Sequence, residues 1–182
     1  PIDNIQDDPF SIQQLIEPTI GINTFGYGQL RYNSTLGAYY QELWLADPND
    51  PLYVRENLTD TDALSETQPD LSFDGNTIAY VHTNVSTIYV RYRNENFAIE
   101  HTLVTNATNP DWAPDGRLAF SRYANGQRDI YIREVNGTEW QLTNDSASDY
   151  NPSWSPDGSA LTYSTYDINT SSESYNIGAV VV

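Results

Sequence analysis

The chain has 182 residues, which is enough for one domain of ordinary size with a buried core. Its 25 acidic residues against eight basic ones give a net charge of −17, and so acidic a surface repels the phosphate backbone of nucleic acids. The absence of cysteine excludes disulfides and thiolate catalysis, and no apolar run approaches the roughly 20 residues of a membrane-spanning helix, so neither nucleic-acid binding nor membrane insertion is expected.

The N-terminal region divides into an acidic arm and a short apolar segment. Residues 1–9 contain three aspartates and Pro9, and they are predicted to lie outside the fold as an arm. Residues 10–17 read as a strand. Leu15 stands seven residues before Ile22, as Leu103 stands seven before Pro110 at the end of a later strand.

Residues 19–58 are predicted to form a first four-stranded unit, whose strands we call a to d in chain order. Strand a is expected near 20–25, strand b near 29–32, strand c near 39–46 and strand d near 52–58. Because residues 10–17 precede this unit, they are left over as a spare strand d.

Three later segments repeat one another and carry the clearest signal in the chain. They begin at Pro69, Pro110 and Pro152, which are 41 and 42 residues apart. Each reads as a strand, a turn with Asp-Gly, and a second strand, and Asp-Gly supplies the positive φ of a tight hairpin turn. Four strands in about 42 residues is the size of one propeller blade, which predicts an all-β propeller of about four antiparallel four-stranded blades.

The segment 151–158, Asn-Pro-Ser-Trp-Ser-Pro-Asp-Gly, preceded by Gln-Leu-Thr-Asn at 141–144, resembles the repeat of TolB-type (WD40-like) β-propellers. The resemblance is strong over 69–164 and weaker over 19–58. It implies the propeller fold, and it implies little about function because one fold hosts many functions. The predicted propeller spans 10–182, with blades at about 19–58, 69–105, 110–143 and 152–182.

The last blade ends at strand c, so the missing strand d matches the spare strand at 10–17. Pairing of the two would protect the apolar edge of the last blade. The pairing closes a ring within one chain, or it joins neighbouring chains by strand addition into rings or filaments. The residues predicted to take part are Phe10, Ile12, Leu15, Ile16, Ile177, Val180, Val181 and Val182.

The Asn-x-Ser/Thr motif occurs seven times and points to N-linked glycans on a secreted protein, although Asn and Thr are also ordinary loop residues. In an antiparallel blade, the b–c and d–a connections leave at one end and the a–b and c–d connections at the other. Asn136 is the one acceptor predicted in a c–d connection, so most glycans are expected at the opposite end. The seven acceptors are Asn33, Asn57, Asn84, Asn106, Asn136, Asn144 and Asn169.

No catalytic or metal-binding constellation is recognised. His82 and His101 are the two histidines, with no third ligand at useful spacing, and no Gly-x-Ser-x-Gly motif is present. No cofactor is therefore expected.

The leading hypothesis is a non-enzymatic structural or assembly protein at the cell surface or outside the cell, with the periplasm as the alternative location. Its expected partners are further copies of itself or another protein. The alternatives are a monomeric propeller that binds a protein or peptide, and a propeller fragment of a larger hydrolase.

Overall fold

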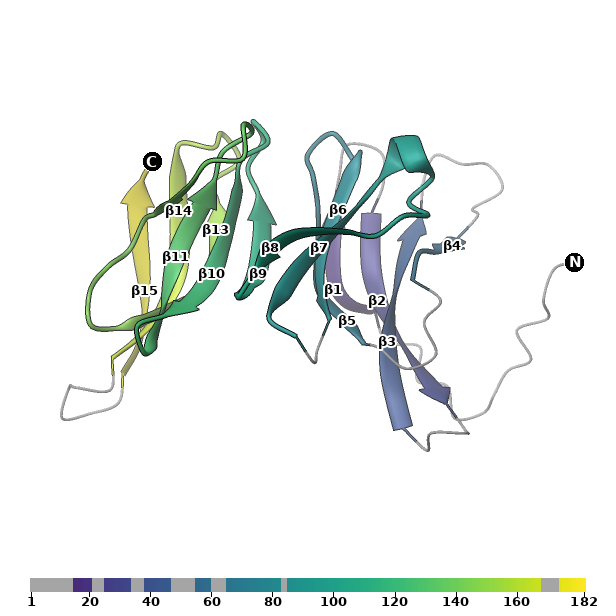
Figure 1. The fold of residues 1–182 in the computed structure, drawn as a ribbon, viewed down its shortest axis with the longest axis horizontal. Helices are drawn as coiled ribbons and strands as arrows, with labels where there is room; N and C mark the ends of the chain where they lie inside the picture. Colours follow the sequence, from purple (N-terminus) through teal and green to yellow (C-terminus); the bar gives the residue numbers. More distant parts are fainter. Residues whose placement is uncertain are drawn as a thin grey trace, which may run out of the picture.

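A computed structural model describes residues 15–20, 25–33, 38–46, 55–59, 65–82, 85–167 and 174–182. The strands form four antiparallel sheets, numbered here in chain order (Figure 1). Sheet one contains β1 (Leu15–Ile20), β2 (Phe25–Asn33), β3 (Ala38–Ala46) and β4 (Arg55–Asn57). Sheet two contains β5 (Glu66–Leu71), β6 (Thr77–His82), β7 (Thr87–Tyr92) and β8 (His101–Thr105). Sheet three contains β9 (Ala107–Trp112), β10 (Leu118–Ala124), β11 (Gln127–Arg133) and β12 (Glu139–Gln141). Sheet four contains β13 (Ser148–Trp154), β14 (Ala160–Asp167) and β15 (Ser174–Val181).

The strands follow one another as neighbours in every sheet, so each sheet is an up-and-down meander. Within the described ranges, one 3₁₀ turn at Arg93–Glu95 is the sole helical element. No helix of the described residues is long and apolar enough to cross a membrane. The predicted all-β architecture is confirmed.

The first strand of each sheet carries a bulge at a proline. The register between β5 and β6 shifts between Thr67 and Asp70, on either side of Pro69. Proline has no N–H to donate to a ladder, so it fits a bulge. The residue before the proline takes positive φ in three sheets. These residues are Gln68 (φ 54°), Asn109 (φ 55°) and Asn151 (φ 52°).

This bulge corrects the prediction for the N-terminal region. Leu15 pairs with Gln29 and Ile16 with Gly28, and the register shifts before Thr19, on either side of Glu17 and Pro18. The segment Leu15–Ile20 is therefore strand a of sheet one, and the prediction of a spare strand d over 10–17 is wrong for its described part. The prediction of strand a near 20–25 is wrong as well, because β2 already begins at Phe25. The proline bulge is the physical signal that fixes the register here.

The hydrophobic core lies between consecutive sheets, and sheets two and three are apolar on both faces. The cluster between sheets one and two contains Leu43, Leu45, Leu58, Leu71, Ile78, Tyr80 and Phe97. The cluster between sheets two and three contains Ala79, Val81, Ile88, Val90, Val104, Ala107, Leu118 and Phe120. The cluster between sheets three and four contains Ala113, Ala119, Ile130, Ile132, Trp154 and Leu161.

The inner strands also bond across sheets. The Trp112 N–H donates to Asp70 and the Trp154 N–H donates to Asp111 at 2.6 Å, so each aspartate binds the first strand of the next sheet. The Arg117 guanidinium donates to the Gly158 carbonyl at 2.7 Å and stacks 4.5 Å from the centre of the Trp154 ring. These bonds fix the order of sheets two, three and four.

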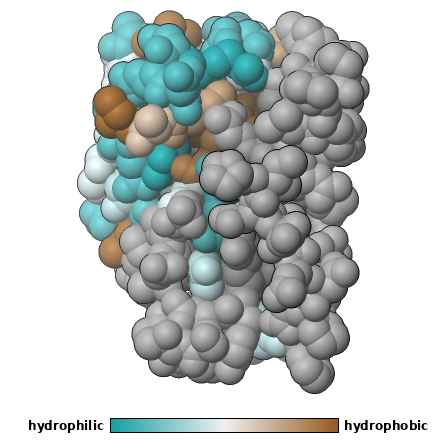
Figure 2. All heavy atoms as spheres, turned by 90° about the vertical axis from the view of Figure 1, so that its right-hand side faces the viewer, coloured by the Kyte–Doolittle hydropathy of each residue, from teal (hydrophilic) through white to brown (hydrophobic). Residues whose placement is uncertain are grey.

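Contacts run from sheet one to two, two to three and three to four, and the described residues make no contact of similar extent between sheets four and one. Figure 1 accordingly shows β15 and β3 toward opposite ends of the long axis, with sheets two and three between them. The surface seen from the end formed by sheets one and two is mostly hydrophilic where it is described (Figure 2).

Candidate assembly interface on sheet four

Sheet four has three strands in the described part of the chain, and β15 lies at its edge with β14 as its neighbour. Four of the residues predicted to take part in assembly, Ile177, Val180, Val181 and Val182, lie in or directly after this strand. Leu15 and Ile16 do not join them, because they belong to β1. Phe10 and Ile12 lie outside the described residues.

Strand pairing places Ile177 at the same position as two fully buried residues. Ile177 lies opposite Ser164, as Ile130 lies opposite Ser121 and Ile88 opposite Val81. Ile130 and Ile88 are 0% exposed, whereas Ile177 is 83% exposed. The residue type is the same, and the difference is the presence of a following sheet.

Neighbouring positions on the same face of β15 follow the same rule. Ala179 lies opposite Thr162 and corresponds to Ile132 and Val90, both fully buried. Val181 is 84% exposed and corresponds to Tyr92, which packs against the core. We call Ile177, Ala179 and Val181 the forward face of β15, since alternate residues of a strand share one face.

The opposite face of β15 is occupied. Val180 and Val182 pack against the cluster between sheets three and four. A Cβ added to Gly178 would lie 2.3 Å from the Tyr163 ring, so the ring rests directly on this backbone. Sheet three has a second ring at this position, where Tyr131 stacks on Phe120 with centroids 6.0 Å apart.

The outer edge of strand c is closed by a Leu-Thr pair in sheets one and three. The Leu142 N–H donates to the Ile130 carbonyl at 2.8 Å, and the Ile130 N–H donates to the Thr143 Oγ1 at 3.0 Å. Sheet one repeats both bonds at the same distances with Leu43, Leu58 and Thr59. Because Ile177 is the equivalent of Ile130, its N–H and carbonyl point toward the open edge.

The ionisable groups of sheet two form a network that the sequence did not indicate. His82 is buried, with Nε2 3.0 Å from Glu100 Oε2 and Nδ1 3.4 Å from Glu66 Oε1. The Tyr80 hydroxyl donates to Glu100 at 2.6 Å, and the Arg91 Nε donates to the Tyr80 oxygen at 2.8 Å. The neighbouring Glu66 carboxylate is the main influence that raises the pKa of His82.

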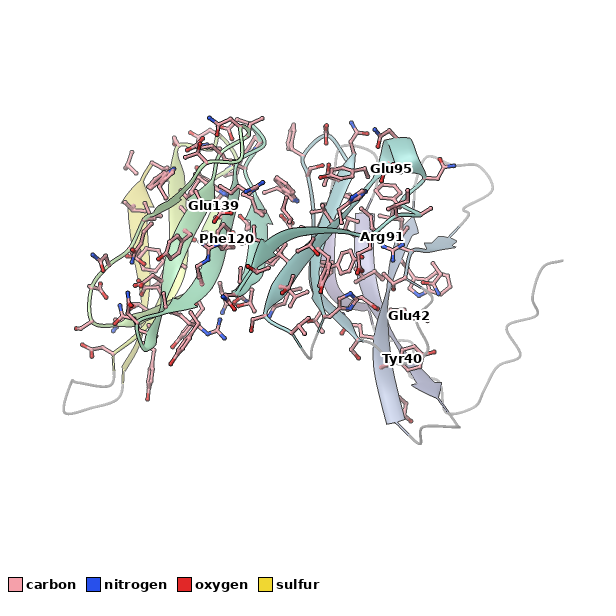
Figure 3. All side chains as sticks on the ribbon, viewed as in Figure 1. Tyr40, Glu42, Arg91, Glu95, Phe120 and Glu139 are labelled. Carbon is pink, nitrogen blue, oxygen red and sulfur yellow. The ribbon has the colours of Figure 1, made fainter. Side chains whose placement is uncertain are left out.

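This network joins side chains of one sheet. Its members come from all four strands or strand ends of sheet two, and Tyr80 places the network on the face that packs against sheet one (Figure 3 labels Arg91). Burial is the main influence that raises the pKa of Tyr80. Burial together with the charge of Asp70 raises the pKa of Asp111 to about 7. Burial also raises the pKa of Asp129 and of Asp149.

The sequence model of the TolB β-propeller domain matches residues 48–179. The chain belongs to this TolB β-propeller family. The match covers most of sheets two to four and little of sheet one, where the repeat was also weakest. A search of curated proteins found no match.

Solved structures show the same fold at low identity. TolB from Acinetobacter baumannii is 19% identical over 91% of this chain and 43% of that chain, with a TM-score of 0.66. The β-propeller domain of the trilobed protease from Pyrococcus furiosus, described as having an open velcro topology, is 16% identical, with a TM-score of 0.62 and coverage of 91% and 53%. An acylaminoacyl peptidase from Pyrococcus horikoshii is 14% identical, with a TM-score of 0.58 and coverage of 89% and 32%. The chain thus spans about half or less of the length of these structures.

Two described glycosylation motifs of this TolB-type fold, at Asn106 and Asn136, lie at the predicted ends of their sheets. The Ala107 N–H donates to the Ser86 carbonyl at 2.9 Å, which places exposed Asn106 beside the b–c turn of sheet two. Exposed Asn136 lies in the β11–β12 turn, and its neighbour Val135 lies beside the a–b turn at Gly116.

The remaining acceptors differ in accessibility. Asn144 is exposed in the link between sheets three and four. Asn57 is half-buried, and its Nδ2 donates to the buried Glu42 carboxylate at 2.9 Å. Asn33 is the last residue of β2, and Asn84 and Asn169 lie outside the described residues. Occupancy by glycans stays a prediction.

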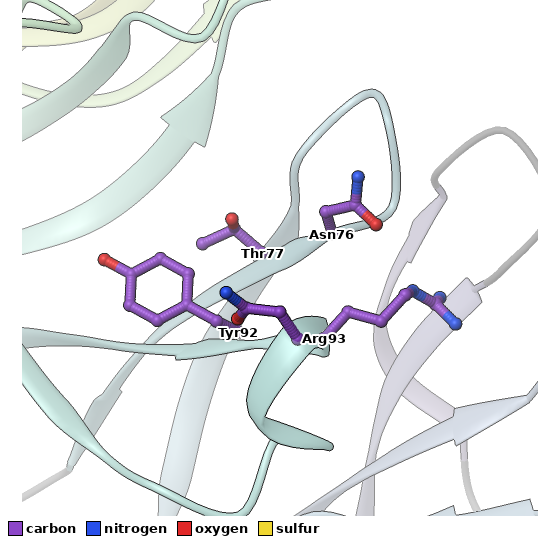
Figure 4. Close-up of a pocket in the computed structure, with 5 residues that line it drawn as sticks. Asn76, Thr77, Tyr92 and Arg93 are labelled. Atoms are coloured by element: carbon purple, nitrogen blue, oxygen red, sulfur yellow. The ribbon is translucent and has the colours of Figure 1, made fainter.

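A pocket of about 420 Å³ lies at the a–b end of sheet two, lined by Asn76, Thr77, Tyr92, Arg93 and Asn94 (Figure 4). The side chains of Tyr92 and Arg93 point to opposite sides in Figure 4, and the Arg93 Nε donates to the Gly75 carbonyl at 3.0 Å. The residues that line the pocket therefore supply amides, hydroxyls and one guanidinium, and no carboxylate. Among the described residues, no group of three or more His, Cys, Asp or Glu is arranged to hold a metal ion.

Proposed function

We propose that this TolB-type propeller is a non-catalytic assembly module that acts outside the cytoplasm, and that another polypeptide supplies the outer strand of its fourth sheet. The observation that carries the proposal is the strand count. Sheets one to three have four strands each, and sheet four has three in its described part, with β15 at the edge.

The chemistry of the edge supports strand addition. An unpaired apolar edge is a template for another strand, and extended peptides use such edges through main-chain hydrogen bonds. The pairing in sheet three, where Tyr131 lies opposite Gln141 and Arg133 opposite Glu139, maps onto Gly178–Val180 of β15. The two bonds that Leu142 and Thr143 make with Ile130 would be made with Ile177 in sheet four. An added strand is therefore expected to pair in this register and to end in Leu-Thr.

The arrangement of the ionisable groups supports a non-catalytic role. His82, Glu66, Glu100 and Arg91 are engaged in one structural network, and Asp70 and Asp111 bind backbone N–H groups of the following sheets. The two aspartates thus join consecutive sheets, and the His82 network joins the strands of sheet two. The raised pKa of Asp111 follows from its burial and from the charge of Asp70.

The glycosylation motifs support a location at the cell surface or outside the cell, with the periplasm as the alternative. Three of the acceptors, Asn106, Asn136 and Asn144, are exposed in connections between strands. We propose N-linked glycans at these positions and expect them to leave the open edge of β15 accessible.

A synthetic peptide tests the proposed strand addition. The peptide carries residues 136–145, the outer strand of sheet three with its Leu-Thr ending, and a fluorescent label. We expect saturable binding and slower hydrogen exchange at the amides of Ile177 and Ala179. The control peptide carries Leu142→Pro, which removes the N–H that would donate to the Ile177 carbonyl, and should not bind.

A matched protein variant makes the test specific to the edge. In sheet three the Ile130 N–H faces the outer strand, and Ile177 is the equivalent residue of sheet four. Alternate residues of a strand direct their N–H groups to the same side, so the N–H of Ala179 also faces the open edge. Ala179→Pro removes this donor and leaves the ladder to β14 intact, because proline is accepted on edge strands with its nitrogen toward solvent. Equal binding of both peptides, or unchanged binding to Ala179→Pro, would refute the proposal.

A further inference from the structure

The forward face of β15 has the composition of a contact between propeller sheets. Ile177 and Val181 are more than four-fifths exposed, and Ala179 between them is exposed too. The equivalent residues of sheets two and three are covered by the next sheet along the chain. An exposed row of large apolar side chains at alternate positions of one strand marks an interaction surface.

The sheets that cover the equivalent faces share one pattern. Leu118 and Phe120, both on strand b of sheet three, pack on Ile88 and Val90 of sheet two. On the forward side of sheet three, Trp154 from strand a and Leu161 from strand b pack on Ile130 and Ile132. The covering sheet therefore brings one large residue at the end of strand a and one or two on strand b.

The first sheet of the chain has this pattern at the same register positions. Ile20 lies opposite Phe25, as Trp112 lies opposite Leu118 and Trp154 opposite Leu161. Tyr27 follows Phe25 by two residues, as Phe120 follows Leu118. Within the described residues, no sheet precedes β1. The described residues thus place an exposed apolar face on β15 and the residue pattern of a covering sheet on β1 and β2.

We infer that the forward face of β15 binds the first sheet of a second copy of this chain, in a head-to-tail contact. This inference rests on the proposed assembly function and names its partner. Two copies joined through both ends would form a ring of eight sheets, which is within the range of four to eight blades known for propellers. A heterologous contact of this kind closes into a ring or continues as a chain.

The charge of the molecule sets the condition for this contact. Each copy carries a net charge of −17, so two copies repel each other at low ionic strength. At about 0.15 M salt the repulsion is screened beyond about 8 Å, whereas the apolar contact is not weakened. Association is therefore expected to increase as salt is added.

Light scattering coupled to size-exclusion chromatography at about 0.15 M salt tests the contact. We expect a mass of twice 20.5 kDa or a larger multiple. The double variant Ile177→Asp, Val181→Asp should return the mass to one copy, because two charges would be buried without partners. The control Val135→Asp changes a residue that is 75% exposed on the β11–β12 turn and should leave the mass unchanged.

Directed disulfides test the orientation, since the chain has no cysteine of its own. A copy with Ile177→Cys mixed with a copy with Phe25→Cys should form a mixed disulfide under mild oxidation. Disulfides between two Ile177→Cys copies in preference to the mixed pair would show a face-to-face contact and overturn the inference.

The outcomes separate this inference from the proposed function. A wild-type chain that stays at one copy, or an assembly that survives Ile177→Asp, Val181→Asp, overturns the head-to-tail contact, while peptide binding to β15 would still support strand addition. Loss of peptide binding with retention of the Ile177-dependent assembly would refute strand addition and leave the head-to-tail contact standing.

Discussion

Sheets three and four are built from the same repeat and differ in what lies beyond them. Both have a proline bulge in the first strand, a tight turn before the second strand and an isoleucine at the same position of strand c. Ile130 is fully buried and Ile177 is 83% exposed. The comparison teaches that burial in a propeller is decided by the neighbouring sheet rather than by the residue, and four predictions can break or sharpen it.

The largest expected effect comes from truncating the two isoleucines. Ile130→Ala should lower the free energy of unfolding by about 3 kcal/mol, because it leaves a cavity between sheets three and four. Ile177→Ala should change it by less than about 0.5 kcal/mol in the single-copy state, because the side chain is exposed there. Urea unfolding at low protein concentration measures both. Similar losses would mean that Ile177 is already covered.

The next effect concerns Asp111, whose equivalent in sheet four is Ser153. The pKa of Asp111 is raised from its ordinary value of 3.8 to about 7, so the folded state disfavours the charged form. This contribution to stability is therefore lost as the pH rises from about 4 to about 7. The raised pKa of His82 acts in the same direction, because the folded state gains from the protonated ring.

Asp111→Asn should remove this pH dependence and keep the acceptor for the Trp154 N–H. We expect the variant to be more stable than the wild type by about 2 kcal/mol at pH 8, with the difference shrinking toward pH 4. Thermal unfolding across this range measures the effect. A constant difference at all pH values would show that Asp111 is not the titrating group.

A smaller effect is expected from the Leu-Thr closure, which sheet three has and which the described residues do not provide for β15. Thr143→Val keeps the shape of the side chain and removes the acceptor of the Ile130 N–H. The loss should be about 1 kcal/mol, since a buried donor is left without a partner. Thr143→Ser keeps the hydroxyl and should restore most of the stability, which separates the hydrogen bond from packing.

The smallest effect on stability is expected from the glycosylation motifs. We expect glycans at the exposed Asn106, Asn136 and Asn144 and none at Asn57, whose amide is bound to buried Glu42. Intact-mass measurement of secreted protein, before and after enzymatic removal of N-glycans, checks this, with Asn-to-Gln variants to assign sites. Each variant should change unfolding by less than about 0.5 kcal/mol. A glycan on Asn57 would contradict the observed hydrogen bond.

Much of the fold could be predicted because the repeat is explicit. The spacing of Pro69, Pro110 and Pro152 and the Asp-Gly turns identify strands, and a strand period fixes which residues share a face. The first sheet was misread because its repeat lacks the Asp-Gly turn. Its proline bulge at Glu17 and Pro18 matches Gln68-Pro69, Asn109-Pro110 and Asn151-Pro152, and this shorter signal would have placed Leu15–Ile20 correctly.

The candidate interface was half predicted. The sequence predicted an apolar strand at the edge of the last sheet and named Ile177 and Val181, and β15 lies at the edge of sheet four in the described residues. The division of β15 into a packed face, with Val180 and Val182, and an open face was not predicted, because alternation gives two faces without saying which one a neighbour covers. The His82 network also required the structure, since Glu66 and Glu100 lie far from it in sequence.

The sequence by itself determined the all-β propeller repeat, because turn chemistry and alternation are local properties that each repeat carries. The tertiary structure alone decided where the first strand begins, which aspartates lie between sheets, and which face of β15 is left open. These features depend on the packing of one sheet against the next, and the local sequence does not predict which residues of another sheet a side chain will contact.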